Sequence, residues 1–580
     1  MLTDDQLKKL TGAVERSYRQ LEPFRRLTKG LIAEYAGPGY GEAEEGTREK
    51  YMNLMNQAVD AYMMLLAGST PRILTSTHAS QHRAFAKRMQ IAGNNLLKRI
   101  NFAETHAEWV MDAFFNVGIV KIHMADSGQV VAEGNVEMDP GMPFVSNISI
   151  DDFVYDTEAK KLTEATYIGD MYRLPREALN DAAIYDQDVV AEMGEGATLE
   201  AGAGSDRIDR LSVGYESDDN RIYDDIDVAD IYVPRAQMVY TFLVESRNRF
   251  TINPRCIAKY KWIGTERGPY RKLGFNPVPK NIMPVGPASH LAPLDRLSNN
   301  LMNKQANQAQ RQKENPVYTP AGTDGAKGLQ NAIDGQWVPV NDAREVSVIR
   351  QGGSDPGNQA FMLNTVQLFD RMAGNLPALI GLGATSDTVG QEKLIHSSAS
   401  KKGAQMQKQV LDATTDVIRE LLYLLWQDGF TTIPGEMTIP QYPQYRVRAD
   451  WTPDLREGQF SDYEVDIDVH SMTYQGPAER IGAINSLLTQ IYAPMAQMLA
   501  EQGGTINFAQ LTEIYAELLN LPRLREVVVF SNPLAESQGP GGEGGGSSMP
   551  ASTERRYVRQ DANGGAPAVP DASAWTGVKR

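Results

Sequence analysis

The feature that most constrains the fold is an uninterrupted helical stretch at residues 391–428. It contains no proline and a single glycine, Gly403, which costs a helix only about 1 kcal/mol. At about 1.5 Å per residue such a helix is roughly 55 Å long, far above the usual helix length in a globular domain. Any fold for this chain must therefore accommodate one long rod.

The two halves of this predicted helix differ in character. From Val410 onward the apolar residues recur at helical spacing, which predicts a face packed against a core. They are Val410, Leu411, Ala413, Val417, Ile418, Leu421, Leu422 and Leu425. Residues 391–409 contain only Leu394, Ile395 and Met406 as large apolar side chains. A helix that is polar nearly all round bridges packed bodies or borders water, so we expect neighbouring subunits of a ring or other oligomer to flank it.

A second helix is predicted just before the long one, at residues 364–375. Pro377 ends it, because proline has no amide donor. A short apolar, glycine-rich turn follows, and then a polar loop at residues 384–390. Either Ser386 or Asp387 in this loop is suited to cap the long helix.

This order of segments resembles a known protein family. A helix ends before Asn375-Leu376-Pro377, Leu379-Ile380-Gly381 follows, and a polar loop leads into a long helix rich in Ser, Ala, Lys and Gln. The order is similar to the tunnel-loop region of the portal (head–tail connector) proteins of tailed bacteriophages. The resemblance implies a loop that projects into a channel for double-stranded DNA. It also implies a long helix that crosses the wing of a ring-shaped dodecamer.

The resemblance implies an α+β fold with a wing, a helical stem, a β-rich clip and a helical crown. The implied segments are the N-terminal part of the wing (1–173), stem helix 1 (174–195), the clip (196–286), stem helix 2 (287–315), the C-terminal part of the wing (316–435) with the tunnel loop (384–390), the crown region (436–530) and a tail (531–580). The tail is rich in Gly, Pro and Ser, so we expect it to be disordered.

Local patterns predict the individual elements of these segments. Residues 4–125 are expected to be mainly helical, beginning with an amphipathic helix that carries Leu7, Leu10, Val14 and Tyr18. Helices are expected at residues 51–67, 102–117, 174–193, 288–314, 478–499 and 508–519. Strands are expected at 119–123, 239–243, 257–262, 336–340, 346–350, 463–470 and 527–530. Residues 129–150 are expected to form a β-hairpin around Asp139, Pro140 and Gly141.

Composition narrows the possible functions. The 580 residues carry a net charge of −16, and 42% of them are hydrophobic, which is enough for real cores. So acidic a chain is unsuited to gripping DNA phosphates tightly, because that grip needs clustered Lys and Arg. It remains compatible with a channel through which DNA slides. The single cysteine, Cys256, excludes an internal disulfide and suits a reducing cytoplasm.

Signals for membranes and for common enzymes are missing from the sequence. No stretch reaches the roughly 20 apolar residues that a membrane helix needs, and the acidic N-terminus lacks an apolar signal core. The segment Gly325-Ala326-Lys327-Gly328 lacks the spacing and the Ser or Thr of a phosphate-binding loop. Neither HExxH nor Gly-x-Ser-x-Gly occurs. We therefore expect a soluble intracellular protein that is not an enzyme and needs no cofactor.

The segment assigned to the clip begins with a sharp change of charge. Residues 184–232 contain fourteen acidic and three basic side chains, whereas residues 235–280 contain ten basic and two acidic ones. One interpretation is a solvated loop beside a small β-unit. The other is a partner-binding surface with paired signs, which steers assembly electrostatically. Its candidate residues are Arg247, Arg249, Lys259, Lys261 and Arg267.

The expected helix at 288–314 also starts amphipathic and finishes polar. By the resemblance it is a stem helix that borders the channel. Its candidate channel-lining residues are Asn303, Lys304, Gln308, Arg311 and Lys313. In the tunnel loop the corresponding candidates are Thr385, Ser386, Asp387 and Thr388, with Lys393 one turn into the long helix.

Three clusters of charged residues have a possible role in binding cations or phosphates. Glu464, Asp466, Asp468 and His470 share one face of a predicted strand, which permits cation binding, although a charged outer face explains them as well. Asp151-Asp152 fits a turn better than a metal site. Lys401-Lys402 either touches passing phosphates or, as the pattern favours, lies on a solvated face or against a neighbouring subunit.

The resemblance also implies partners and a location. The chain is expected to form a homo-oligomeric ring at one capsid vertex of the virion, after assembly in the host cytoplasm. Its expected partners are a terminase packaging motor, the major capsid and scaffolding proteins, and tail adaptor proteins. Double-stranded DNA is expected to pass through without tight binding. The alternative is another head–tail adaptor or ring scaffold of a phage, although such adaptors are usually much smaller.

Deleting residues 385–388 tests the expected tunnel loop. A polar, short-chained loop between two glycines is suited to line a constriction, and Asp387 repeated around a ring makes an acidic girdle that repels phosphate. The deletion should spare ring assembly but impair DNA packaging or retention, measured as the DNA content of particles. If Asp387 serves only as a helix cap, the deletion mutant will assemble and package full-length DNA normally.

Overall fold

The computed structural model describes most of the chain up to residue 468. The described residues are 2–37, 40, 51–127, 131–133, 136–139, 141–181, 184–191, 225–247, 250–318, 327, 346–351, 353, 355–376, 389–439 and 442–468. The chain divides into two compact units, Met1–Gly476 and Pro477–Arg580, and all described residues belong to the first. The predictions for 336–340, 478–499, 508–519, 527–530 and 531–580 lie outside the described residues, as does the loop at 384–390 except for residues 389 and 390, which already belong to a helix.

The main core of this unit forms around α12 (Val389–Gln427), the long helix that the sequence predicts. Most apolar residues of its second half are buried, among them Val410, Val417, Ile418 and Leu421, while Leu411 and Ala413 are partly buried against the same core. Around it pack α3 (Leu54–Leu66), the three-stranded sheet and β16, while α4 (Arg83–Arg99) and α5 (Phe102–Phe115) complete the same core. The prediction of a core-facing second half is therefore confirmed.

A three-stranded antiparallel sheet lies against α5 and α12. Its strand order is β11 (Tyr270–Leu273), β2 (Gly118–Ala125), β5 (Met142–Ile148). The expected hairpin at 129–150 is wrong in its pairing. β5 pairs with β2, while β3 (Val131–Glu133) pairs with β4 (Val136–Met138), so the turn at Asp139 joins strands of different sheets.

A five-stranded antiparallel sheet forms the second layer. Its strands, in spatial order, are β10 (Thr251–Lys261), β9 (Met238–Ser246), β8 (Asp225–Val233), β7 (Ile168–Pro175) and β6 (Phe153–Tyr155). Helix α1 (Asp4–Gln20) packs on this sheet through Leu7, Leu10, Val14 and Tyr18, the stripe that the sequence predicts. Helix α2 (Glu22–Ala36) follows α1 directly and contacts α3, α5 and α8.

This sheet corrects two expectations. A single stem helix at 174–195 is wrong, because β7 continues to Pro175 and the next helices are short, α6 (Arg176–Asp181) and α7 (Gln187–Ala191). The expected clip at 196–286 is not a separate β-unit either. Along its length β7 pairs with β8, from Ile168 opposite Tyr232 to Pro175 opposite Asp225. Alternating apolar residues predict which segments form strands but not which strands pair. The predicted boundary at residue 196 therefore separated β7 from β8, although these two strands pair with each other.

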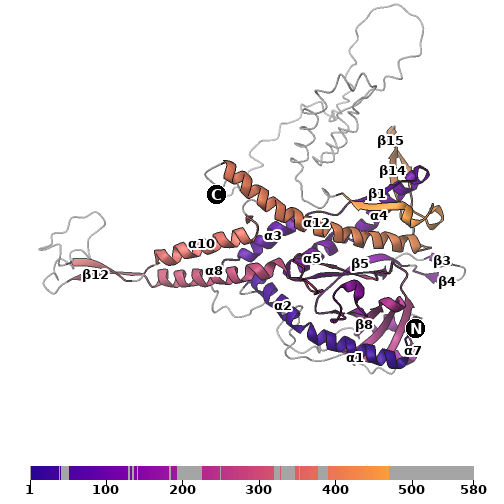
Figure 1. Ribbon diagram of the computed structural model, residues 1–580, viewed down its shortest axis with the longest axis horizontal. Coiled ribbons are helices and arrows are strands. Elements are labelled where there is room, and N and C mark those ends of the chain that lie inside the picture. Colours follow the sequence, from indigo (N-terminus) through magenta and orange to yellow (C-terminus); the bar gives the residue numbers. More distant parts are fainter. Residues whose placement is uncertain are drawn as a thin grey trace, which may run out of the picture. The chain divides into compact units, whose positions relative to one another are not determined.

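The paired long helices lie later in the chain than expected. Helix α8 (Pro287–Gln310) packs along α10 (Pro356–Met372), and the antiparallel strands β12 (Lys313–Tyr318) and β13 (Val346–Gln351) lie between them in the sequence (Figure 1). The chain thus runs out along α8 and back along α10. Helix α10 begins before the expected residue 364, because Asp355 caps it and Pro356 suits its first turn.

Two small strand pairs complete the described unit. Strand β14 (Glu436–Ile439) pairs with β15 (Tyr442–Arg448), and β1 (Ile73–Thr77) pairs with β16 (Tyr463–Ile467). β16 alternates as predicted, with Tyr463, Val465 and Ile467 buried. Among the described helices, none is long and apolar enough to cross a membrane.

The core around α12 makes a direct stability prediction. Leu421→Ala removes a fully buried side chain and should lower the free energy of unfolding by about 2–5 kcal/mol, measured by chemical denaturation. Lys408→Ala on an exposed position of the same helix is the matched control and should stay within about 0.5 kcal/mol of the parent. Equal effects of the two substitutions would contradict this placement of the core.

Candidate functional site

The hairpin formed by α8 and α10 is anchored to the core near its base. Gly286 precedes α8 and lies so close to α5 that an added Cβ would approach the Phe115 carbonyl oxygen to 2.1 Å. About two and a half turns further along the helix, the buried Asp295 carboxylate accepts a hydrogen bond from the Leu54 amide at 3.1 Å. Asn299 accepts one from the Met52 amide at 2.7 Å. These side chains meet the N-terminus of α3, where a carboxylate is favoured by the helix dipole.

Burial raises the pKa of Asp295. The amide donors of α3 and the Tyr51 hydroxyl, 3.2 Å away, act against this effect by stabilising the charged form. The hydrogen bonds at the base of α8 are thus shielded from water, and they fix the orientation of α8 relative to α3.

Most of the predicted channel-lining residues lie together on the outer half of α8. Lys304 and Arg311 are exposed, and Asn303 and Gln308 are partly buried. The Gln308 side chain accepts a hydrogen bond from the Asp355 amide at 3.4 Å, so it connects α8 to the start of α10. Lys313 lies in β12, and its side chain is outside the described part.

Helix α10 carries large apolar side chains that its own subunit leaves uncovered. Phe361, Leu363, Leu368 and Met372 are between 41% and 53% exposed, whereas Phe369 is buried. At roughly 100° per residue, Phe361, Leu368 and Met372 share one face of the helix, and Leu363 lies nearly opposite. The buried contact with α8 is therefore flanked by apolar surface on both sides.

The polar half of α12 is connected to its own chain more closely than expected. Lys402 donates a hydrogen bond to the Met372 carbonyl at the C-terminus of α10, at 2.7 Å, and burial lowers its pKa. Gln407 and Gln409 donate to the carbonyls of Leu65 and Phe275. The sequence predicted a half that bridges packed bodies or borders water, and residues 402–409 are held in part by these contacts within the chain. Lys401 and Lys402 are both exposed, as one alternative expected, and Lys402 also contacts its own chain.

The structure does not bring the expected clip residues together as one free surface. Arg247 forms ion pairs with Asp152 at 3.0 Å and Asp227 at 3.5 Å, inside the five-stranded sheet region. Arg267 pairs with Asp416 of α12 at 2.9 Å. Lys259 and Lys261 on β10 are exposed, as is Arg267 beside its ion pair, while Arg249 lies outside the described residues.

The remaining candidates show no metal site in the described part. Glu464 accepts hydrogen bonds from Ser76 and His78, and Asp466 is an exposed neighbour on the same strand face. Among the described residues there is no group of three or more potential metal ligands. His470, Thr385, Ser386, Asp387 and Thr388 lie outside them, as does the side chain of Lys393 in α12. Residues 149–152 form the predicted turn, closed by a hydrogen bond from the Asp152 amide to the Ser149 carbonyl.

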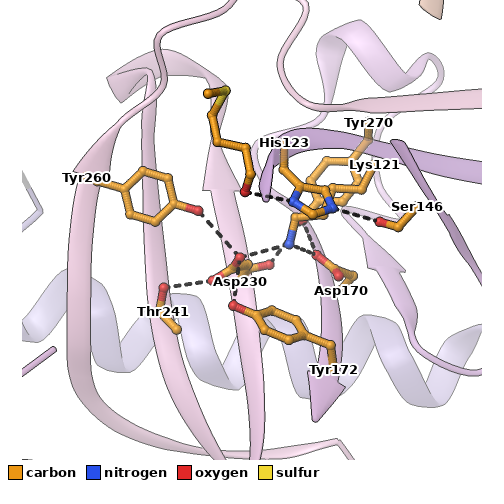
Figure 2. A network of polar contacts seen from close by, with 10 residues as sticks. Lys121, His123, Ser146, Asp170, Tyr172, Asp230, Thr241, Tyr260 and Tyr270 are labelled. Atoms are coloured by element: carbon orange, nitrogen blue, oxygen red, sulfur yellow. Dashed lines mark hydrogen bonds and ion pairs between the residues drawn. The ribbon is translucent and has the colours of Figure 1, made fainter. Parts of the chain in front are cut away.

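A buried charge cluster joins the two sheets, and none of the predictions from the sequence included it (Figure 2). Lys121 of β2 donates hydrogen bonds to Asp170 of β7 and to Asp230 of β8, both at 2.8 Å. The two carboxylates are direct cross-strand partners. Tyr270 donates to Asp170, and Thr241, Tyr172 and Tyr260 donate to Asp230. We call these seven residues the Lys121 cluster.

The Lys121 cluster is almost completely shielded from solvent. Burial works to lower the pKa of Lys121, but the two carboxylates outweigh it and hold the pKa above its ordinary value. Burial raises the pKa of Asp170. It acts in the same direction on Asp230, but Lys121 and the hydroxyl donors hold the pKa of Asp230 below its usual range. Of the two carboxyl groups, Asp170 therefore retains a proton more readily.

One sequence signal could have pointed to this cluster. Lys121, Asp170 and Asp230 each interrupt an apolar strand that is buried on both faces, and a charge in such a strand requires a partner. The spacing along the chain does not reveal which partner it is. Nearby, burial lowers the pKa of His123 to about 4, so this histidine is neutral beside Ser146.

Comparisons with known proteins assign no family to the chain. No protein-family model matches it, and no curated protein sequence matches it. The functional interpretation therefore depends on the geometry described above.

The anchor of α8 can be tested with Asp295→Ala. This change leaves the buried Leu54 amide without its acceptor and should lower the free energy of unfolding by about 1–3 kcal/mol, measured by denaturant titration. Asp295→Asn keeps an acceptor oxygen and should recover part of the loss. Asn300→Ala, an exposed change on the same helix, should have almost no effect. A loss for Asn300→Ala as large as for Asp295→Ala would contradict the proposed anchor.

Proposed function

We propose that this chain is a subunit of the portal ring of a tailed bacteriophage, the conduit for double-stranded DNA during packaging and ejection. The observation that carries the proposal is one run of elements: α8, the pair β12 and β13, α10, and then the 39-residue helix α12. Two packed helices around a β-insert, followed by a loop and a long helix that returns to the core, match the portal order.

The structure supports a different placement of the parts from the one expected from sequence. In the revised proposal α8 and α10 are the two stem helices. Residues 311–355, which contain β12 and β13, form the clip. Residues 377–388 correspond to the tunnel loop, and the two sheets with α1 to α5 and α12 form the wing. Motor and tail-adaptor docking is then expected at residues 311–355 rather than at 235–280.

The uncovered apolar residues of α10 support assembly into a ring. A heterologous contact repeated around a closed ring uses two different surfaces on every subunit. The hairpin offers apolar side chains on both flanks of its internal contact, with Phe361 on one side and Leu363 on the other. Side chains this large and this exposed on one helix are typical of an interface with another protein.

The electrostatics are consistent with a conduit. With a net charge of −16, a ring of such subunits repels DNA overall and is suited to passage rather than retention. Lys304 and Arg311, exposed on α8, supply scattered positive charges along a polar surface. Such a ring works with a separate packaging motor, which supplies the energy.

The second candidate is another ring scaffold or head–tail adaptor of a phage. The same exposed flanks of α10 favour an oligomer in either case. Negative-stain microscopy of purified protein discriminates between a portal and other assemblies, because it shows the ring and its channel directly. The portal function itself is tested by measuring DNA packaging in particles assembled without the protein and again after the protein is supplied.

Replacing Phe361 and Leu368 together with Asp should break the ring. The two charges face the proposed neighbour, and burying them unpaired is unfavourable. We expect the ring to be replaced by monomers or short assemblies in mass photometry, with helix content unchanged by circular dichroism.

The control is the double variant Lys8→Asp and Lys9→Asp on exposed positions of α1, which changes charge without touching the hairpin. It should assemble as the parent does. A Phe361 and Leu368 double variant that still forms complete rings would rule out this interface.

A further inference from the structure

The Lys121 cluster places an amine and two carboxyl groups in direct contact inside the protein. The Lys121 Nζ lies 2.8 Å from Oδ1 of Asp170 and 2.8 Å from Oδ2 of Asp230. The Tyr270 hydroxyl donates to the same Asp170 oxygen at 2.5 Å. A structural ion pair needs only one carboxylate for one ammonium, so the second carboxyl group is unexplained by charge balance alone.

We propose that Lys121 and Asp170 form an intramolecular isopeptide bond, with Asp230 as the group that accepts the lysine proton. The bond would join β2 of the three-stranded sheet covalently to β7 of the five-stranded sheet. This inference does not depend on the proposed portal function, because it uses only the buried cluster.

The reaction balances without any co-reactant. The Lys121 ammonium transfers one proton to the Asp230 carboxylate, and the neutral amine attacks the side-chain carboxyl carbon of protonated Asp170. The Nζ–Cγ bond forms, one Cγ–O bond breaks, and the hydroxyl leaves with a proton from the nitrogen as water. The products are an amide, one water molecule and a protonated Asp230, so the cluster is electrically neutral before and after the reaction.

The neighbouring side chains suit this chemistry. Negative charge develops on the Asp170 oxygen during attack, and Tyr270 already donates to that oxygen from a fully buried position. Thr241, Tyr172 and Tyr260 hold the Asp230 carboxylate beside the amine. The pKa directions favour a protonated Asp170 and an ionised Asp230 at the start of the reaction. The pKa of Lys121 is raised, so the transfer of its proton to Asp230 is uphill and slows the reaction.

Burial favours the amide over the separated ions. Lys121, Asp170 and Asp230 are each less than 10% exposed, so bulk water has little access to hydrolyse the bond. Replacing an ammonium and a carboxylate by a neutral amide also removes the desolvation cost of two buried charges.

Intact-mass spectrometry of the purified, folded full-length chain tests the proposal. The expected mass is lower than that of the sequence by one water molecule. Protease digestion should yield a branched peptide that joins the segment of Lys121 to that of Asp170, which distinguishes the cross-link from a cyclised aspartate elsewhere. A full mass, with both residues recovered in separate linear peptides, would overturn the proposal.

Variants separate the chemistry from a purely structural role. Asp230→Asn retains the shape and the hydrogen-bonding site but removes the proton acceptor, and should restore the full mass. Lys121→Arg, which retains the charge, should also show the full mass. Tyr270→Phe should leave a mixture of linked and unlinked protein. A complete mass deficit in Asp230→Asn would overturn the assignment of Asp230.

Discussion

The described fold depends on the contacts that hold the second half of α12 in place. Its apolar face is buried from Val410 onward, and one buried carboxylate, Glu420, fixes its position against the sheets. Glu420 pairs with Arg271 of β11 at 2.7 Å and accepts a hydrogen bond from the Thr265 amide. An unpaired carboxylate at this depth would be strongly unfavourable, so the helix is held at one rotation and one height. The sheets, α3 and the hairpin are all placed relative to this rod.

The sequence predicted those parts of the fold that depend on local periodicity. The rod, the stripe of α1 and the alternation of β16 could be derived because each repeats a helical or strand spacing within one segment. Pairing between distant segments could not. β7 with β8 and β2 with β5 are chosen by packing between strands far apart in the chain, and the predicted boundary at residue 196 therefore separated two strands that pair.

The candidate sites show the same division. Exposed Lys304 and Arg311 could be read from a polar helix, but the partners of Arg247, Arg267 and Lys402 could not, because those partners lie on other elements. A lysine inside an apolar strand signals that partners exist without naming them. The members of the Lys121 cluster could therefore be identified only from the packing of the two sheets against each other.

The attachment of the hairpin at one end has a mechanical consequence. Asp295 and Asn299 attach α8 to the start of α3, and Lys402 attaches the last turn of α10 to α12. The outer end of the hairpin is not attached by these contacts. Beyond Asn299, 11 residues of α8 remain before Gln310, so a tilt of about 5° there displaces a tip roughly 17 Å away by about 1.5 Å. A small change in these hydrogen bonds is thus amplified at the tip, and the bond from Lys402 is one path by which a force on α10 reaches α12.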